Sequence, residues 1–152
     1  MKVFGWLGAF LLLTGVASAQ EPVKWQFTAK KVDNKTYEVR ITATVDKPWH
    51  LYSQSSPADG PLPTKIQFTK NPLLLLTGKT SEHGEVKEKY EDVFAVTVKY
   101  FAGGAEFKQV VKLKNEKVKT NLGGSVEFMA CTDEQCLPPK TIPFNIPINQ
   151  VK

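Results

Sequence analysis

The chain lacks the patterns that predict helices or membrane spans. No stretch keeps a helical spacing of apolar residues over about ten positions. Beyond residue 20, no apolar run approaches the ~20 residues that a bilayer span requires. No low-complexity linker divides the sequence either. These absences predict one all-β domain that does not span a membrane in its mature form.

Several catalytic and binding signatures are also missing. Residues 77–80, Thr-Gly-Lys-Thr, end like a phosphate-binding loop, but that motif requires glycine where this chain has Leu73. No serine has a nucleophile signature, and Cys-x-x-Cys is absent. The lysines are scattered among acidic residues, so no nucleic-acid partner is predicted despite a net charge of +5.

The N-terminus has the layout of a secretory signal peptide. Lys2 precedes an apolar run from Val3 to Val16, and residues 17–19, Ala-Ser-Ala, form a small-x-small cleavage site. No cysteine follows this site to carry a lipid. We therefore expect residues 1–19 to be cleaved and residues 20–152 to form the exported domain. A retained anchor is the alternative.

The rest of the sequence alternates apolar and polar residues in short segments bounded by turn residues. The pairs Gly103-Gly104 and Gly123-Gly124 predict hairpin turns, and residues 73–76 are predicted as a buried strand. The other predicted strands are 25–29, 37–45, 65–68, 94–101, 107–113 and 126–130. Short strands without intervening helices predict an antiparallel β-sandwich.

Residues 141–148 place isoleucine or phenylalanine on one face and proline or asparagine on the other. Pro143 and Pro147 remove two N–H donors from the same side of this segment, so it is predicted as an edge strand. Residues 48–63 and 77–92 are predicted as long loops, which in compact domains often carry the functional site.

Cys131 and Cys136 are the only cysteines, and four residues separate them. A disulfide between them closes a short loop that stabilises a fold by about 2 kcal/mol, against about 4.7 kcal/mol for a 100-residue loop. This difference favours a reversible dithiol/disulfide couple over a structural bridge, and both alternatives stay open. Asp133 and Glu134 are expected to disfavour a thiolate if their charges face the sulfur atoms.

A soft-metal site is the third alternative for the cysteines. Cys131, Cys136, Met129, His50 and His83 together would suit Cu(I). The two histidines are isolated in predicted loops and expected at the surface, and no repeated ligand spacing supports the set. We therefore predict neither a metal nor a cofactor.

The segment from Val126 to Pro139 resembles the active hairpin of the N-terminal periplasmic domain of DsbD, the thiol–disulfide interchange protein. Both contain a strand, a cysteine, a short acidic loop, a second cysteine and a Pro-Pro pair. Residues 49–54 resemble that family's aromatic segment near its cysteines, and residues 88–92 resemble the segment that enters the next strand. The resemblance covers most of the mature chain.

This resemblance implies an immunoglobulin-like β-sandwich in the periplasm and a thiol–disulfide oxidoreductase activity. The partners that it implies are thioredoxin-like periplasmic proteins, which are reduced, and a membrane-embedded electron donor. By position, Cys136 would attack the partner's disulfide and Cys131 would resolve the mixed disulfide. The neighbours implied for the sulfur atoms are His50, Tyr52, Glu82 and His83.

Glu82 aligns with an acidic residue proposed to manage protons in the family, and His83 falls near its capping aromatic residue. Three departures accompany the resemblance. The cysteines are four residues apart rather than five, the capping aromatic is not found near His83, and neither a membrane domain nor a thioredoxin-like domain is present. The electron donor is therefore expected in trans. An immunoglobulin-like binding module with a structural disulfide is the alternative function.

Overall fold

The computed structural model describes residues 21–150, so the predicted signal peptide lies outside the described residues. The described residues contain no helix, and hence none able to cross a membrane. The strands are β1 (Val23–Lys31), β2 (Thr36–Val45), β3 (His50–Tyr52), β4 (Lys65–Phe68), β5 (Leu74–His83), β6 (Val86–Glu91), β7 (Val96–Ala102), β8 (Gly104–Leu113), β9 (Thr120–Phe128), β10 (Ala130–Cys131) and β11 (Lys140–Ile148).

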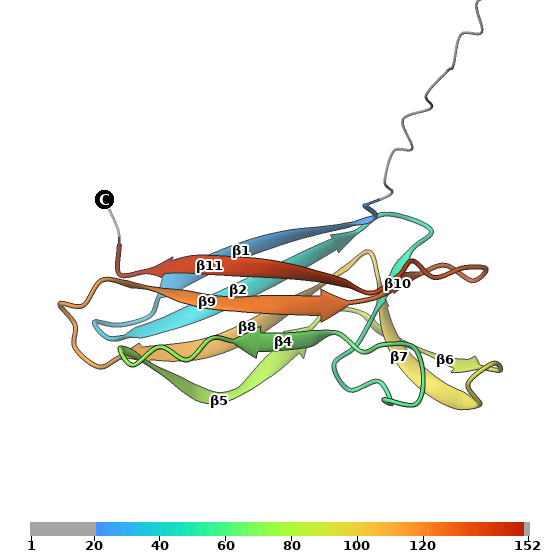
Figure 1. Ribbon diagram of the computed structural model, residues 1–152, viewed down its shortest axis with the longest axis horizontal. Helices are drawn as coiled ribbons and strands as arrows, with labels where there is room; N and C mark the ends of the chain where they lie inside the picture. The colour runs from blue at the N-terminus through green and yellow to red at the C-terminus, as the bar shows by residue number, and fades with distance from the viewer. Residues whose placement is uncertain (1–20, 151–152) are drawn as a thin grey trace, which may run out of the picture.

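Three antiparallel sheets have the strand orders β1-β2-β8-β5, β11-β9-β4 and β10-β3-β7-β6. The first two pack face to face, and the third extends from one end of this sandwich (Figure 1). Alternate residues of β2 and β8 point into the space between the sheets, where Val39, Ile41 and Phe107 are buried. The predicted antiparallel β-sandwich is therefore confirmed.

One local prediction is confirmed as well. Strand β11 pairs only with β9 and lies at the edge of its sheet, as its prolines require. The hairpin predicted at Gly103 and Gly104 is wrong, because β7 and β8 belong to different sheets and do not pair. The two glycines instead carry the chain from one sheet to the other, with φ angles of 98° and 152° that favour glycine.

The prediction of a buried strand at residues 73–76 is wrong in its burial. Only Leu74 is buried, whereas Leu73, Leu75 and Leu76 are exposed. The reason is that β5 lies at the edge of its sheet, so an uninterrupted leucine run does not place the strand in the interior. The prediction of a long loop at residues 77–92 is also wrong, because this segment consists mainly of β5 and β6. Both are edge strands, which explains their polar composition.

Three further details differ from the sequence prediction. The predicted loop 48–63 contains β3, whose three residues are all buried, so His50 is not at the surface. Strand β7 begins at Val96 rather than at Phe94, which lies in the turn before it. Gly123 and Gly124 lie inside β9 instead of forming a hairpin turn. Gly124 is required there because the Phe144 ring and the Gln67 carbonyl occupy the space of a side chain.

Candidate redox site

The two cysteines lie on a short hairpin that continues from β9 into β10. Cys131 pairs with Cys136 in an antiparallel bridge. The Thr132 N–H donates to the Gln135 carbonyl at 2.7 Å, and the Thr132 hydroxyl accepts from the N–H groups of Glu134 at 3.2 Å and Gln135 at 3.1 Å. A threonine side chain thus fixes the turn locally and brings the two sulfur atoms together.

The disulfide between Cys131 and Cys136 has an S–S distance of 2.02 Å. The two residues differ in access, since Cys131 is 1 % exposed whereas Cys136 is exposed to solvent. A thiolate can exchange only with a sulfur atom that it can reach. Cys136 is therefore the more accessible of the two cysteines, and Cys131 stays enclosed.

Cys131 is enclosed on one face of the sheet β10-β3-β7-β6. The other face belongs to the main core, to which Leu51 and Phe101 contribute. On its own face Cys131 packs with Tyr52 and Val98. Partly buried side chains complete this group, which we call the cysteine cluster: Val96, Tyr100 and Met129.

His50 lies directly opposite Cys131 in the pairing of β3 with β10 and is 5 % exposed. Its ring centroid is 4.8 Å from that of Tyr100, and its Nε2 is 3.2 Å from the Tyr52 hydroxyl oxygen. Burial lowers the pKa of His50, and the positive charge of Lys89 lowers it further. The imidazole is therefore neutral at pH 7.

Charged residues of β6 border the cysteine cluster. The Lys89 Nζ is 2.9 Å from the Asp133 carboxylate of the cysteine hairpin and 3.7 Å from Glu91. The hydrogen bond from Lys89 lowers the pKa of Asp133, so the charge expected to disfavour a thiolate is paired with a lysine. Burial, and next the charge of Glu91, raise the pKa of Tyr52 far above its ordinary value. The phenol therefore keeps its proton.

Glu82 of β5 holds the loop that follows β3. Its carboxylate accepts hydrogen bonds from the Ser53 hydroxyl, from the Gln54 N–H at 2.9 Å and from the Ser55 hydroxyl at 3.4 Å. The same loop covers the cysteine cluster farther on, where Gly60 lies against Val96. Glu82 thus positions a loop that covers the cysteine cluster, and its hydrogen bonds go to this loop rather than to the cysteine hairpin.

We expect Glu82→Ala to lower the free energy of unfolding by about 1–3 kcal/mol, because the buried Ser53 hydroxyl and the Gln54 N–H lose their acceptor. Urea denaturation measures this loss, and hydrogen exchange of the Gln54 amide should become faster. His83→Ala, on the same strand but exposed, is the matched control and should change stability by less than about 0.5 kcal/mol. An unchanged rate of hydrogen exchange at the Gln54 amide would contradict the conclusion that Glu82 holds this loop.

The structure thus brings His50 and Tyr52 beside Cys131, whereas the hydrogen bonds of Glu82 go to the loop after Tyr52. His83 is exposed at the end of β5, with its Nε2 3.0 Å from the Ser81 hydroxyl. Residues 21–150 contain no group of three His, Cys, Asp or Glu side chains arranged to bind a metal.

Sequence reasoning did not find Tyr100 or Lys89 as neighbours of the site. The alternation of residues 96–100 indicates which of them share a face, but not what that face meets. Only the pairing of β7 with β3, which sets Tyr100 opposite Tyr52, and with β6, which sets Lys89 opposite Val98, brings them to the cysteine cluster.

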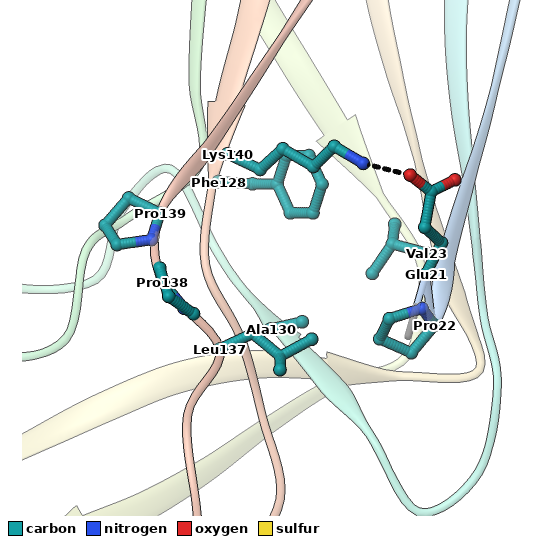
Figure 2. Close-up of a pocket in the computed structure, with 9 residues that line it drawn as sticks. All are labelled: Glu21, Pro22, Val23, Phe128, Ala130, Leu137, Pro138, Pro139 and Lys140. Atoms are coloured by element: carbon teal, nitrogen blue, oxygen red, sulfur yellow. Dashed lines mark hydrogen bonds and ion pairs between the residues drawn. The ribbon is translucent and has the colours of Figure 1, made fainter. Parts of the chain in front are cut away.

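An apolar pocket of about 400 Å³ lies at the base of the cysteine hairpin (Figure 2). Ala130 and Leu137, one from each leg of the hairpin, line one side, and the ion pair of Glu21 with Lys140 borders the opposite side. Successive residues of a strand point to opposite faces. Because Ala130 faces the pocket, Cys131 points away from it, and the pocket is not where disulfide exchange occurs.

Residues 17–147 match the family described as the N-terminal part of the thiol:disulfide interchange protein DsbD. The chain belongs to this family. The resemblance inferred from the cysteine hairpin is therefore confirmed, and the chain is a thiol–disulfide interchange domain of the DsbD N-terminal type.

Two solved structures share the fold. The N-terminal periplasmic domain of ScsB from Proteus mirabilis has 14 % sequence identity and a TM-score of 0.60, over 83 % of this chain and 46 % of that one. The N-terminal domain of Neisseria meningitidis DsbD in the reduced form has 16 % identity and a TM-score of 0.51, over 79 % of this chain and 82 % of that one. No curated protein matches the sequence. The immunoglobulin-like sandwich that the resemblance implied is confirmed.

Proposed function

We propose that this DsbD-type domain is a periplasmic electron carrier that reduces thioredoxin-like partner proteins through Cys131 and Cys136. The observation that carries the proposal is the unequal access to the two sulfur atoms. Cys136 is exposed and Cys131 is 1 % exposed, so a partner meets only one of them. A membrane-embedded donor would return the oxidised pair to the dithiol.

The proposed reaction has two exchange steps. The Cys136 thiolate attacks one sulfur of the partner's disulfide, and the partner's other sulfur leaves as a thiolate. Cys131 then loses its proton and attacks the Cys136 Sγ, so the intramolecular disulfide forms and the bond to the partner breaks. The pair loses two electrons, the partner gains them, and its two thiolates take up the two protons that the cysteines released.

The alternative function is that of a binding module with an inert disulfide. The two functions separate by the midpoint potential of the pair, measured at equilibrium with glutathione. A carrier requires a potential that biological dithiols can reach, whereas structural disulfides lie below about −300 mV. A value far below that limit would exclude the carrier function.

We expect the reduced domain to remain folded. Reduction should lower the free energy of unfolding by only about 2 kcal/mol, because the disulfide closes a short loop. The core around Phe107 lies between two sheets, and neither sheet contains Cys131 or Cys136. Urea denaturation with and without a phosphine reductant measures the difference, and a variant with both cysteines changed to alanine should show none. Unfolding on reduction would identify the disulfide as a structural bridge.

A further inference from the structure

The proposed exchange leaves one chemical requirement unmet by the cysteines themselves. Cys131 must become a thiolate to release the partner, yet it is 1 % exposed. Burial disfavours a thiolate because it removes the hydration of the charge. An enclosed thiol therefore reacts quickly only when a neighbouring group accepts its proton.

We infer that His50 is this proton acceptor, an inference that rests on the proposed function. His50 and Cys131 are direct partners in the pairing of β3 with β10, so their side chains lie on the same face of the sheet. The Cβ atoms of such partners are about 4.5–5.5 Å apart. At this separation an imidazole reaches a thiol on the partner strand.

The surroundings of His50 suit a base. Its imidazole is 5 % exposed and neutral at pH 7, because burial lowers its pKa. The Tyr52 hydroxyl oxygen is 3.2 Å from Nε2, and burial, together with the charge of Glu91, raises the pKa of this phenol. We assign the tautomer in which the phenol oxygen accepts from His50 Nε2–H, which leaves Nδ1 as the basic nitrogen.

The carboxylates of this region are less suited than His50 to accept the Cys131 proton. Glu82 is bound to the loop after β3, and Asp133 is paired with Lys89. The titratable and charged groups that face His50 or the cysteine cluster come from several elements: Tyr52 of β3, Tyr100 of β7, Lys87, Lys89 and Glu91 of β6, Asp133 of the cysteine turn and Cys131 of β10. None of the other groups lies opposite Cys131 in the strand pairing. The residue opposite Cys131 is His50, and its neutral imidazole can take up a proton near pH 7.

The step balances as follows. In the mixed disulfide, the Cys131 thiol gives its proton to His50 Nδ1, and the resulting thiolate attacks the Cys136 Sγ. The bond between Cys131 and Cys136 forms, and the bond between Cys136 and the partner breaks. The partner's sulfur leaves with the electron pair, and His50 passes its proton to solvent.

The test uses the reduced full domain and an aromatic disulfide, dithiobis(nitrobenzoate). Attack by Cys136 releases one coloured thionitrobenzoate, and resolution by Cys131 releases a second, so two kinetic phases report the two steps. We expect His50→Gln to slow the second phase about 100-fold at neutral pH and to leave the first unchanged. The wild-type second phase should slow as pH falls through the His50 pKa. In the variant, the rate of the second phase should instead rise about tenfold per pH unit, up to the pH at which the Cys131 thiol itself ionises.

His83→Gln, the other histidine, is the matched control and should alter neither phase. Equal slowing of both phases by His50→Gln, or no slowing, would overturn the role of His50. Absence of the first phase in the wild type would instead refute the proposed carrier function. If His50→Gln does not fold, NMR titration of the native His50 decides. Its imidazole should titrate at lower pH in the dithiol than in the disulfide form, because the Cys131 S–H donates to Nδ1 and stabilises the neutral ring, and identical titrations would overturn the inference.

Discussion

Replacing Cys131 by serine is expected to convert a transient exchange into a stable covalent complex. Cys136 remains exposed and can still attack the partner's disulfide, but no second thiol of the domain can resolve the product. Because resolution is intramolecular, its loss should slow release by at least about 1000-fold. Non-reducing electrophoresis and mass spectrometry of the trapped species measure the complex and identify the partner.

Cys136→Ser is the matched control for this trap. It leaves only Cys131, which is 1 % exposed and should not reach a partner's disulfide. We expect no covalent complex from this variant, nor from the double serine variant. If Cys136→Ser trapped the partner better than Cys131→Ser, the attacking and resolving roles would be reversed.

Gly124→Ala is expected to cause the largest loss of stability among the substitutions considered. A Cβ at this position would lie 2.3 Å from the Gln67 carbonyl oxygen and 2.4 Å from the Phe144 Cζ. Both neighbours belong to strands that pair with β9, so relief requires movement of the sheet. We expect the free energy of unfolding to fall by at least about 3 kcal/mol, measured by urea denaturation.

Gly123→Ala tests whether space, rather than loss of glycine as such, causes this effect. A Cβ on Gly123 would be 3.5 Å from the nearest atom, the Thr69 Oγ1, which is an ordinary contact. We expect a change of less than about 1 kcal/mol, of either sign. Equal losses for the two neighbouring glycines would show that the close contacts of Gly124 do not determine its identity.

The sequence was sufficient for those features that depend on local pattern. Alternation at residues 37–45 and 107–113 predicted strands that the structure contains. Pro143 and Pro147 predicted an edge strand because a missing N–H is a property of the residue itself. The cysteine spacing predicted a close pair for the same reason, since a short turn brings the two sulfur atoms together.

Local pattern failed where a residue's environment depends on a distant strand. The leucines at 73–76 have the composition of a buried strand, but β5 has a neighbour on one side only. A Gly-Gly pair is typical of a turn, but Gly124 lies inside β9. Glycine is required at this position because Phe144 and Gln67, on the two strands that pair with β9, leave no space for a side chain. Residues 77–92 look like a loop because edge strands tolerate charge.

For the cysteine site the division is similar. The sequence by itself predicted that Cys131 and Cys136 form a close pair in a β domain, because their spacing and flanking residues are local. The tertiary structure alone decided which cysteine is exposed, since β3 and β7 bury Cys131 beneath Tyr52 and Val98. It also decided what surrounds that sulfur. His50, Tyr100 and Lys89 come to the cysteine cluster only because four strands, β10, β3, β7 and β6, pair in one register. Register is set by packing across the whole sheet rather than by any one segment.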